Sequence, residues 1–236
     1  MTELIDERIN QITDIINETC SKLGRNPDHI KLMAVSKSYP LSAVEKAYKH
    51  GINFFGESRV QEGIKKFSLF YENLKQENSP KSNTEVHLIG SLQRNKAKKA
   101  ADFFDCIQSV DSLSLIDELG KFTLGRKEPL MIYLEYLTGE ESKKGFPDLD
   151  SLFYAAEKVH AFEGLKPMGL MTMAPFTDEE KSIRTSFRKC YIAAQELSNR
   201  FGKHSWSNLS MGMSSDFKIA LEEGSNLIRI GTAIFG

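Results

Sequence analysis

Lys37 is the residue of this sequence that is best placed for covalent chemistry. It directly follows LMAVS, residues 32–36, an apolar run with the length and composition of a buried strand. When a lysine amine at the end of such a strand is partly desolvated, it can act as a Schiff-base amine toward a carbonyl compound. The alternative is a solvated lysine at the rim of the fold, and position alone leaves both interpretations open.

The segment SMGMSSD, residues 210–216, has the composition of an anion-binding loop. Glycine lets the backbone approach an anion closely, hydroxyl groups donate hydrogen bonds, and the short helix expected after the loop adds amide donors at its N-terminus. The alternative is that Ser214 or Ser215 only caps that helix. Gly231 and Thr232, which follow the next apolar run, offer a second pair of small donors.

Two polar residues interrupt apolar runs. Arg229 lies within LIRI, where a charge must point outward or find a buried partner, so a bound cofactor and a surface ion pair are both consistent with it. His87 lies within VHLI, and a lone histidine in a strand is more often a hydrogen-bonded core residue than a catalytic one. The basic segment 93–99 lacks interleaved aromatic residues and is typical of a solvated helix face.

These side chains need a scaffold that brings the ends of several strands together. Short apolar runs alternate with longer helical segments, as in β/α units around a parallel sheet. Eight runs are present, the number that closes a (β/α)8 TIM barrel, in which functional residues lie at the carboxyl ends of the strands. The predicted strands are 32–36, 52–55, 86–89, 106–110, 130–136, 168–173, 209–211 and 227–230.

Helical periodicity separates the runs. Apolar residues at three- and four-residue steps predict helices within 60–74 and 183–201, and Thr177 with Glu180 predicts a capping box at the start of the second. Gly51 and Gly224 suit left-handed helix ends. The segments 76–83 and 138–147 are the expected loops.

The two ends of the chain are expected to complete the barrel. The chain stops at Gly236, which predicts no helix after the eighth strand, while apolar residues from Ile5 to Leu23 predict a helix before the first strand that covers the resulting gap. With no linker in evidence, residues 1–236 are expected to form a single domain.

Composition restricts the partners and the compartment. Lys and Arg number 31 against 32 Asp and Glu, so no overall field favours nucleic acid or an anionic membrane, and no apolar segment is long enough to span a bilayer. The cysteines lack the spacing of metal ligands, and we expect no metal site. Their number and spacing suit reduced packing residues, which predicts a cytoplasmic protein, and we expect a monomer. The three cysteines are Cys20, Cys106 and Cys190.

The sequence resembles the pyridoxal phosphate homeostasis proteins, a family similar to the N-terminal barrel of alanine racemase. The resemblance spans nearly the whole chain, and its first and last motifs are highly specific in order and spacing. It rests on AVSKSYP (34–40), FGESRVQE (55–62), HLIGSLQRNK (87–96), GLMTMAP (169–175) and LSMGMSSDFKIALEEGSNLIRIGTAIFG (209–236).

The resemblance implies that the protein binds pyridoxal 5'-phosphate (PLP) as a Schiff base on Lys37. It further implies that Ser210, Gly231 and Thr232 hold the phosphate and that Arg229 faces the pyridine nitrogen. The loop from Met211 through Gly212 to Ser214 would complete the phosphate site, and His87 is a further candidate for cofactor contact.

The chain also departs from the family pattern. Ser58 and Arg59 stand where asparagine and often an aromatic residue are usual, Ser91 replaces a proline, and Arg94 replaces a serine. These differences affect the family's secondary contacts near the ends of the second and third strands.

The resemblance favours a protein that captures, buffers and delivers PLP, with PLP-dependent apo-enzymes as partners, over one with robust turnover. A charged guanidinium opposite the ring nitrogen disfavours the protonated pyridinium that stabilises carbanions. Alanine racemase also takes its second proton donor from a C-terminal domain, which this sequence, ending at Gly236, is expected to lack.

Two enzyme classes remain as alternatives. One is a racemase or decarboxylase of the alanine-racemase barrel type, which requires an acid or base such as His87, Tyr133 or Tyr136 near the cofactor. The other, reached without the resemblance, is an aldolase in which Lys37 forms a Schiff base with a sugar phosphate. The lack of a visible Schiff-base absorbance after PLP is added would favour the aldolase.

Overall fold

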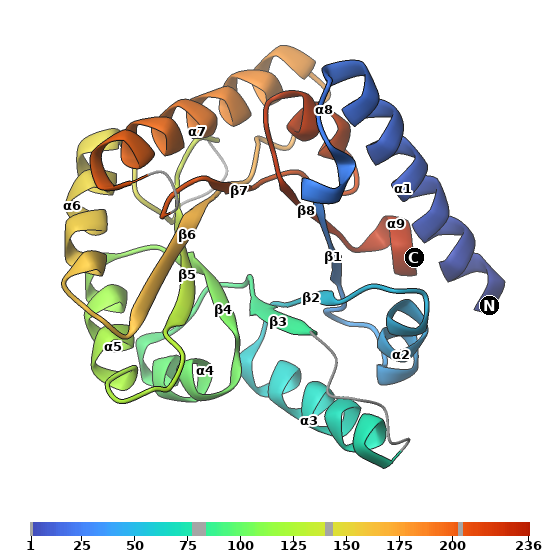
Figure 1. The fold of residues 1–236 in the computed structure, drawn as a ribbon, viewed down its shortest axis with the longest axis horizontal. Coiled ribbons are helices and arrows are strands. Elements are labelled where there is room, and N and C mark those ends of the chain that lie inside the picture. The colour runs from blue at the N-terminus through green and yellow to red at the C-terminus, as the bar shows by residue number, and fades with distance from the viewer. Residues whose placement is uncertain (1, 77–83, 140–143, 203–204) are drawn as a thin grey trace.

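Eight parallel strands close into a barrel in the computed structural model, which describes residues 2–76, 84–139, 144–202 and 205–236 (Figure 1). Each strand pairs with its neighbours in sequence order, and β1 pairs with β8 to close the ring. The predicted (β/α)8 barrel is confirmed. The strands are β1 Lys31–Val35, β2 Phe54–Glu57, β3 Glu85–Leu88, β4 Cys106–Val110, β5 Leu130–Glu135, β6 Leu165–Met171, β7 Asn208–Ser210 and β8 Leu227–Ile230.

Helices surround the barrel, and both amphipathic helices predicted from periodicity are present. Parts of the two expected loops, 77–83 and 140–143, lie outside the described residues. The helices are α1 Thr2–Leu23, α2 Leu41–Lys49, α3 Val60–Gln76, α4 Ala97–Phe103, α5 Leu113–Phe122, α6 Leu149–His160, α7 Glu180–Phe201, α8 Phe217–Glu222 and α9 Thr232–Phe235, with short 3-10 turns at Pro27–His29 and Arg94–Lys96.

The apolar residues form two cores. The larger one lies between the strands and the surrounding helices and includes Phe55, Phe67 and Phe187. The smaller one fills the inside of the barrel, where side chains from alternating strand positions meet. It consists of Met33, Cys106, Tyr133, Met171 and Leu227. Because the interior is packed below its mouth, a ligand of the barrel itself must bind at the open end.

Helix α1 lies along the outside of the barrel beside α8 and α9, as Figure 1 shows. The Arg25 guanidinium donates hydrogen bonds to the carbonyl oxygens of Leu221 (2.5 Å) and Ser225 (2.7 Å), which ties the end of α1 to the end of α8. The helix predicted before the first strand is therefore confirmed. The expectation that no helix follows β8 is wrong, because one helical turn, α9, begins directly after Gly231.

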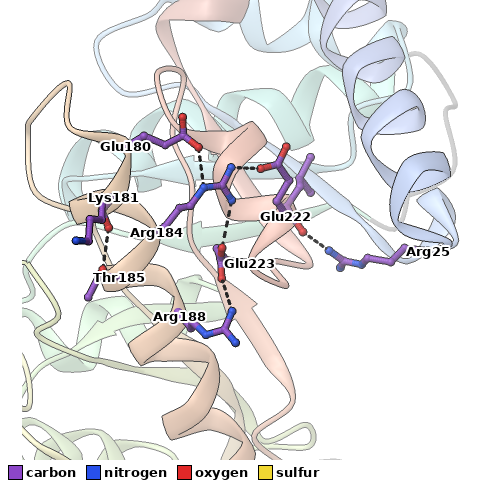
Figure 2. Close-up of polar contacts among 9 residues, drawn as sticks. Arg25, Glu180, Lys181, Arg184, Thr185, Arg188, Glu222 and Glu223 are labelled. Atoms are coloured by element: carbon purple, nitrogen blue, oxygen red, sulfur yellow. Dashed lines mark hydrogen bonds and ion pairs between the residues drawn. The ribbon is translucent and has the colours of Figure 1, made fainter.

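An ion-pair cluster joins α7 to α8 (Figure 2). The Arg184 guanidinium pairs with Glu180 on its own helix at 2.7 Å and with Glu222 and Glu223 at the end of α8. Arg188 also approaches Glu223, at 3.7 Å. The cluster fixes α8, and with it the loop that precedes α8, against the longest helix on that side.

The predicted ends of helices are only partly confirmed. Gly51 and Gly224 have the expected positive φ angles of 97° and 101°. The capping box at Thr177 is wrong, because α7 begins at Glu180 with Glu179 as its N-cap residue. The Thr177 hydroxyl instead accepts a hydrogen bond from the Glu179 amide at 3.1 Å. Among the described residues, no helix combines the length and apolar character needed to cross a membrane.

We predict that α1 contributes substantially to stability. Ile12 on α1 is 4% exposed, so Ile12→Ala should lower the free energy of unfolding by about 2–4 kcal/mol in urea denaturation, through lost burial and the cavity that it leaves. Leu23→Ala is the control, because Leu23 lies on the same helix but is 42% exposed, and it should cost less than about 1 kcal/mol. Equal losses for the two variants would contradict the packing of α1.

Candidate functional site

A cavity of about 530 Å³ opens at the carboxyl ends of the strands. Five of the nine residues selected from the sequence line it: Lys37, Ser214, Arg229, Gly231 and Thr232. They come from the segments after β1, β7 and β8 and from β8 itself, which are neighbours in the closed sheet. The barrel therefore brings together the amine, the guanidinium and both small-residue loops.

The backbone beside Lys37 is held by a buried group of hydrogen-bonded polar residues. Lys37 follows Ser36, whose hydroxyl donates a 2.7 Å hydrogen bond to the Glu57 carboxylate on β2. The Lys66 ammonium, from α3, donates to the same carboxylate and to the Ser36 carbonyl oxygen, both at 2.7 Å. Ser38, just after Lys37, adopts a left-handed φ of 68°. These contacts of Ser36 fix the backbone next to Lys37, while the Lys37 side chain is exposed and lines the cavity.

The loop between β7 and α8 is shaped by Gly212 and Asp216. Gly212 has a φ of 100°, and a Cβ atom there would lie 2.6 Å from the Cβ of Ala220, so only glycine fits. The Asp216 carboxylate accepts a 2.6 Å hydrogen bond from the Met213 amide and closes the turn. This turn presents Ser214, whose Oγ accepts from the Ala233 amide at 3.3 Å and lies 3.2 Å from Thr232 Oγ1.

Arg229 is a buried cation at the floor of the cavity. Its NH1 group donates to the carbonyl oxygen and the hydroxyl of Ser210, at 2.5 and 2.8 Å, and NH2 donates to the Thr172 carbonyl oxygen at 2.9 Å. Burial lowers the pKa of Arg229 to about 10, so the guanidinium remains charged at neutral pH. Since a guanidinium has five N–H donors, two remain beyond these three hydrogen bonds.

The other four selected residues lie below or beside the cavity rather than on its wall. His87 is buried inside the barrel, where its ring lies 2.8 Å from the Gln108 amide nitrogen and 3.0 Å from Glu85. The Ser210 hydroxyl donates to Gln108 at 2.6 Å and accepts from Arg229. Met211 is a core residue, and Gly212 shapes the loop. Their effect on a ligand is therefore indirect, through Arg229 and the loop.

Glu135 is a functional candidate that the sequence reasoning missed. It ends β5, is 6% exposed and is the one carboxylate among the described residues that line the cavity. Burial, with a smaller contribution from the Asp111 charge, raises the pKa of Glu135 to about 7. Tyr133 and Tyr136, which the sequence suggested as acids or bases, are packed in the cores instead.

Two of the four departures from the family pattern reach the cavity. Ser58 and Ser91 are on its wall, and Ser91 accepts a 2.6 Å hydrogen bond from Lys144. Arg59 instead pairs with Glu62 on the surface of α3 at 2.7 Å, and Arg94 lies in a 3-10 turn.

The fold and the cavity define a barrel of the alanine racemase type. Residues 13–236 match the protein family described as alanine racemase, N-terminal domain. A pyridoxal phosphate homeostasis protein from Vibrio alginolyticus is 35% identical over 98% of this chain and 97% of its own length. One from Aquifex aeolicus is 34% identical over 98% of this chain. The chain belongs to the pyridoxal phosphate homeostasis protein family.

Solved structures agree with this assignment. PipY of Synechococcus elongatus, in a structure with PLP bound, has a TM-score of 0.78 and 32% identity, with 94% of this chain and 100% of PipY covered. A protein of unknown function from Bifidobacterium adolescentis has a TM-score of 0.91 at 27% identity, with 99% of this chain and 95% of that one covered. Alanine racemase of Clostridium difficile, at 12% identity, shares the fold over 56% of its length (TM-score 0.74, 99% of this chain).

We predict that Glu135 makes stability fall as pH rises. Its folded-state pKa is raised from 4.5 to about 7, so the folded protein binds the extra proton between these values and the free energy of unfolding decreases across that window. Glu135→Gln should therefore stabilise the protein by about 1–3 kcal/mol at about pH 8 and have little effect below pH 4.5. Urea denaturation at both pH values tests this, and an equal effect at both would refute it.

Proposed function

We propose that residues 1–236 act as one PLP-binding domain in vitamin B6 homeostasis, with Lys37 as the amine that holds the cofactor. The observation that carries the proposal is the exposed Lys37 side chain on the wall of a cavity that also contains Arg229 and the hydroxyls of Ser214 and Thr232. Relatives that this chain covers almost completely are named for PLP homeostasis, and PipY has been solved with PLP bound.

The cavity has the size and donors that PLP requires. A volume of about 530 Å³ lies within the range of small-molecule sites. Lys37 supplies a primary amine, and Ser214, Ser215 and Thr232 supply hydroxyl donors for a phosphate. When bound, PLP supplies an aldehyde that condenses reversibly with a primary amine.

Each group then has a defined position to fill. Lys37 would hold the aldehyde carbon, and Ser214, Gly231 and Thr232 would hold the phosphate at the neighbouring loops. Arg229 would lie beside the ring nitrogen, and its hydrogen bonds to Ser210 and Thr172 keep the guanidinium oriented. Ser210 contributes through Arg229, and His87 contributes through Gln108 and Ser210.

This arrangement favours binding and release of PLP over turnover. The buried, charged Arg229 opposes protonation of a ring nitrogen beside it, because two positive charges would then lie close together. PLP stabilises carbanions best with a protonated ring. We therefore propose that the protein buffers PLP and supplies it to apo-enzymes.

We further propose that the protein acts as a monomer in the cytoplasm. The three free, buried thiols of Cys20, Cys106 and Cys190 suit a reducing compartment.

A second candidate function is an amino-acid racemase or decarboxylase. The observation that favours it is Glu135, a carboxylate in the cavity that can exchange a proton near neutral pH. Steady-state turnover of an amino acid by the purified protein, lost in Lys37→Ala, would establish this function in place of the buffering one.

We predict that Lys37 is the residue that PLP modifies. Borohydride reduction of the PLP-loaded protein followed by peptide mapping should place the label on the peptide that contains Lys37. Lys37→Ala should remove both the label and the Schiff-base absorbance without unfolding, because an exposed side chain contributes little packing. Lys49→Ala, which removes an exposed lysine from the end of α2, is the control and should label normally. Labelling of Lys37→Ala at the wild-type level would overturn the proposal.

We predict that the phosphate and ring contacts can be separated. Thr232→Val removes a hydroxyl donor to the phosphate and should weaken PLP retention about tenfold with an unchanged absorbance spectrum. Arg229→Gln should shift the spectrum of bound PLP more than it weakens retention, because the charge beside the ring is lost. Equilibrium dialysis and absorbance titration measure the two effects, and an unchanged spectrum in Arg229→Gln would remove the residue from its ring role.

A further inference from the structure

Glu135 lies in the cavity without a partner. The residue is 6% exposed, and none of the described residues forms a hydrogen bond or ion pair with its carboxylate. No fully buried polar side-chain atom of the described residues lacks a partner, so the Glu135 carboxylate opens onto the cavity, where an unpaired acid is a candidate for a role in the site. Glu135 and Lys37 come from opposite sides of the ring, because Glu135 ends β5 and Lys37 follows β1.

The charged groups around Glu135 are few. Asp111, after β4, raises its pKa, while Arg229 on β8 and Lys144, after β5, lower it. Lys37 lines the same cavity. The Glu135 carboxylate, with which no described group pairs, is therefore available to an ammonium group that enters the cavity.

A neighbouring cavity provides an approach for such a group. It has a volume of about 630 Å³ and shares Met173, Met213 and Ser215 with the cofactor cavity. Its described wall combines apolar side chains, including the 87% exposed Phe176, with the carboxylates of Asp178, Glu180 and Asp216. No Lys, Arg or His is among these described wall residues. Glu180 pairs with Arg184 and the Asp216 carboxylate accepts the Met213 amide, so the wall is mainly apolar with Asp178 as a further carboxylate. An aliphatic chain matches this surface, whereas a carboxylate does not.

We propose that Glu135 accepts a proton from an incoming primary ammonium ion, so that the resulting amine displaces Lys37 and carries PLP out of the site. The inference rests on the proposed function and adds the class of acceptor. This acceptor is an aliphatic primary amine with no carboxylate at the end of the chain far from the amine. A lysine side chain of an apo-enzyme and a free alkylamine share this chemistry.

The exchange balances without an oxidant or reductant. The ammonium gives its proton to the Glu135 carboxylate, and the amine lone pair forms a bond to the carbon that Lys37 holds. With the C=N nitrogen protonated before and after the exchange, one proton passes from the incoming nitrogen to the Lys37 nitrogen. The bond between the carbon and the Lys37 nitrogen then breaks, and the released Lys37 amine takes a further proton from water at the exposed rim. Glu135 returns its proton to water, so the net change is one ammonium consumed and one released on Lys37.

The test follows transfer of PLP from the loaded protein to n-pentylamine by stopped-flow absorbance. The wild-type rate should increase with amine concentration, rise with pH as Glu135 ionises, and level off above about pH 7. In Glu135→Gln only the free amine can react, so the rate should fall about 10²-fold near neutral pH and keep rising with pH without levelling off.

Asp111→Asn is the matched control. It removes the like charge that raises the pKa of Glu135 but leaves the cavity wall intact, so the pH at which the rate levels off should decrease while the dependence on amine remains. A merely structural role for Glu135 would not produce this decrease in the pH at which the rate levels off. Replacing pentylamine by 5-aminopentanoate, which carries a carboxylate at the far end of a similar chain, should slow the exchange in the wild-type protein.

A measurement on the unloaded protein tests the same inference independently. In carbon-13 NMR, n-pentylammonium chloride should lower the pKa of the Glu135 carboxyl, and potassium chloride at equal ionic strength should not. Equal amine-dependent rates in wild type and Glu135→Gln would overturn the inference while leaving PLP binding intact. Failure of the proposed function is distinguishable, because the protein would then show no Lys37 label before any amine is added.

Discussion

The pairing of β1 with β8 is the constraint on which the site depends. These strands are far apart in sequence, and their register, with Met33 opposite Arg229 and Ala34 opposite Ile230, brings the segment after β1 beside the segment after β8. Lys37 and Gly231–Thr232 therefore become neighbours only when the ring closes. Helix α1 covers this seam, and Arg25 ties α1 to α8. A local peptide containing Lys37 would have the amine without the anion-binding loop.

Buried polar groups give the site its rigidity. The Ser36–Glu57–Lys66 contacts hold the backbone beside Lys37, and the chain from Glu85 through His87, Gln108 and Ser210 ends at Arg229. Such networks are favourable only when every member is satisfied, which is the case in both. Glu135 differs, because its carboxylate forms no hydrogen bond or ion pair with any residue that the structure describes. The free energy lost by burying it is the kind of local cost that functional sites carry.

The sequence predicted the barrel and its strand ends well, because apolar runs and helical periodicity are local signals. Lys37, Gly231 and Thr232 were identified because they directly follow such runs. The sequence did not predict how deep each strand residue lies along the barrel axis. His87 and Ile89 share one face of the same strand segment, yet His87 is buried and Ile89 lines the cavity. This depth depends on the stagger between strands, which irregularities such as that at Ile132 and Tyr133 alter.

Glu135 was missed for the same reason. It lies in LMIYLEY, which reads as an apolar strand, and its two tyrosines drew attention as acids or bases. Tyr133 and Glu135 lie on the same face of β5, but only Glu135 is high enough to reach the cavity. Thr177 shows a different limit, because the capping pattern is present while the helix begins two residues later than the pattern indicates.

A crystal structure of the PLP-loaded protein tests the central claim most directly. The account predicts continuous electron density from Lys37 Nζ to the cofactor, with the phosphate between the loops that carry Ser214 and Thr232 and the ring nitrogen toward Arg229. Cofactor density that is separate from Lys37, or a phosphate bound away from these two loops, would contradict it.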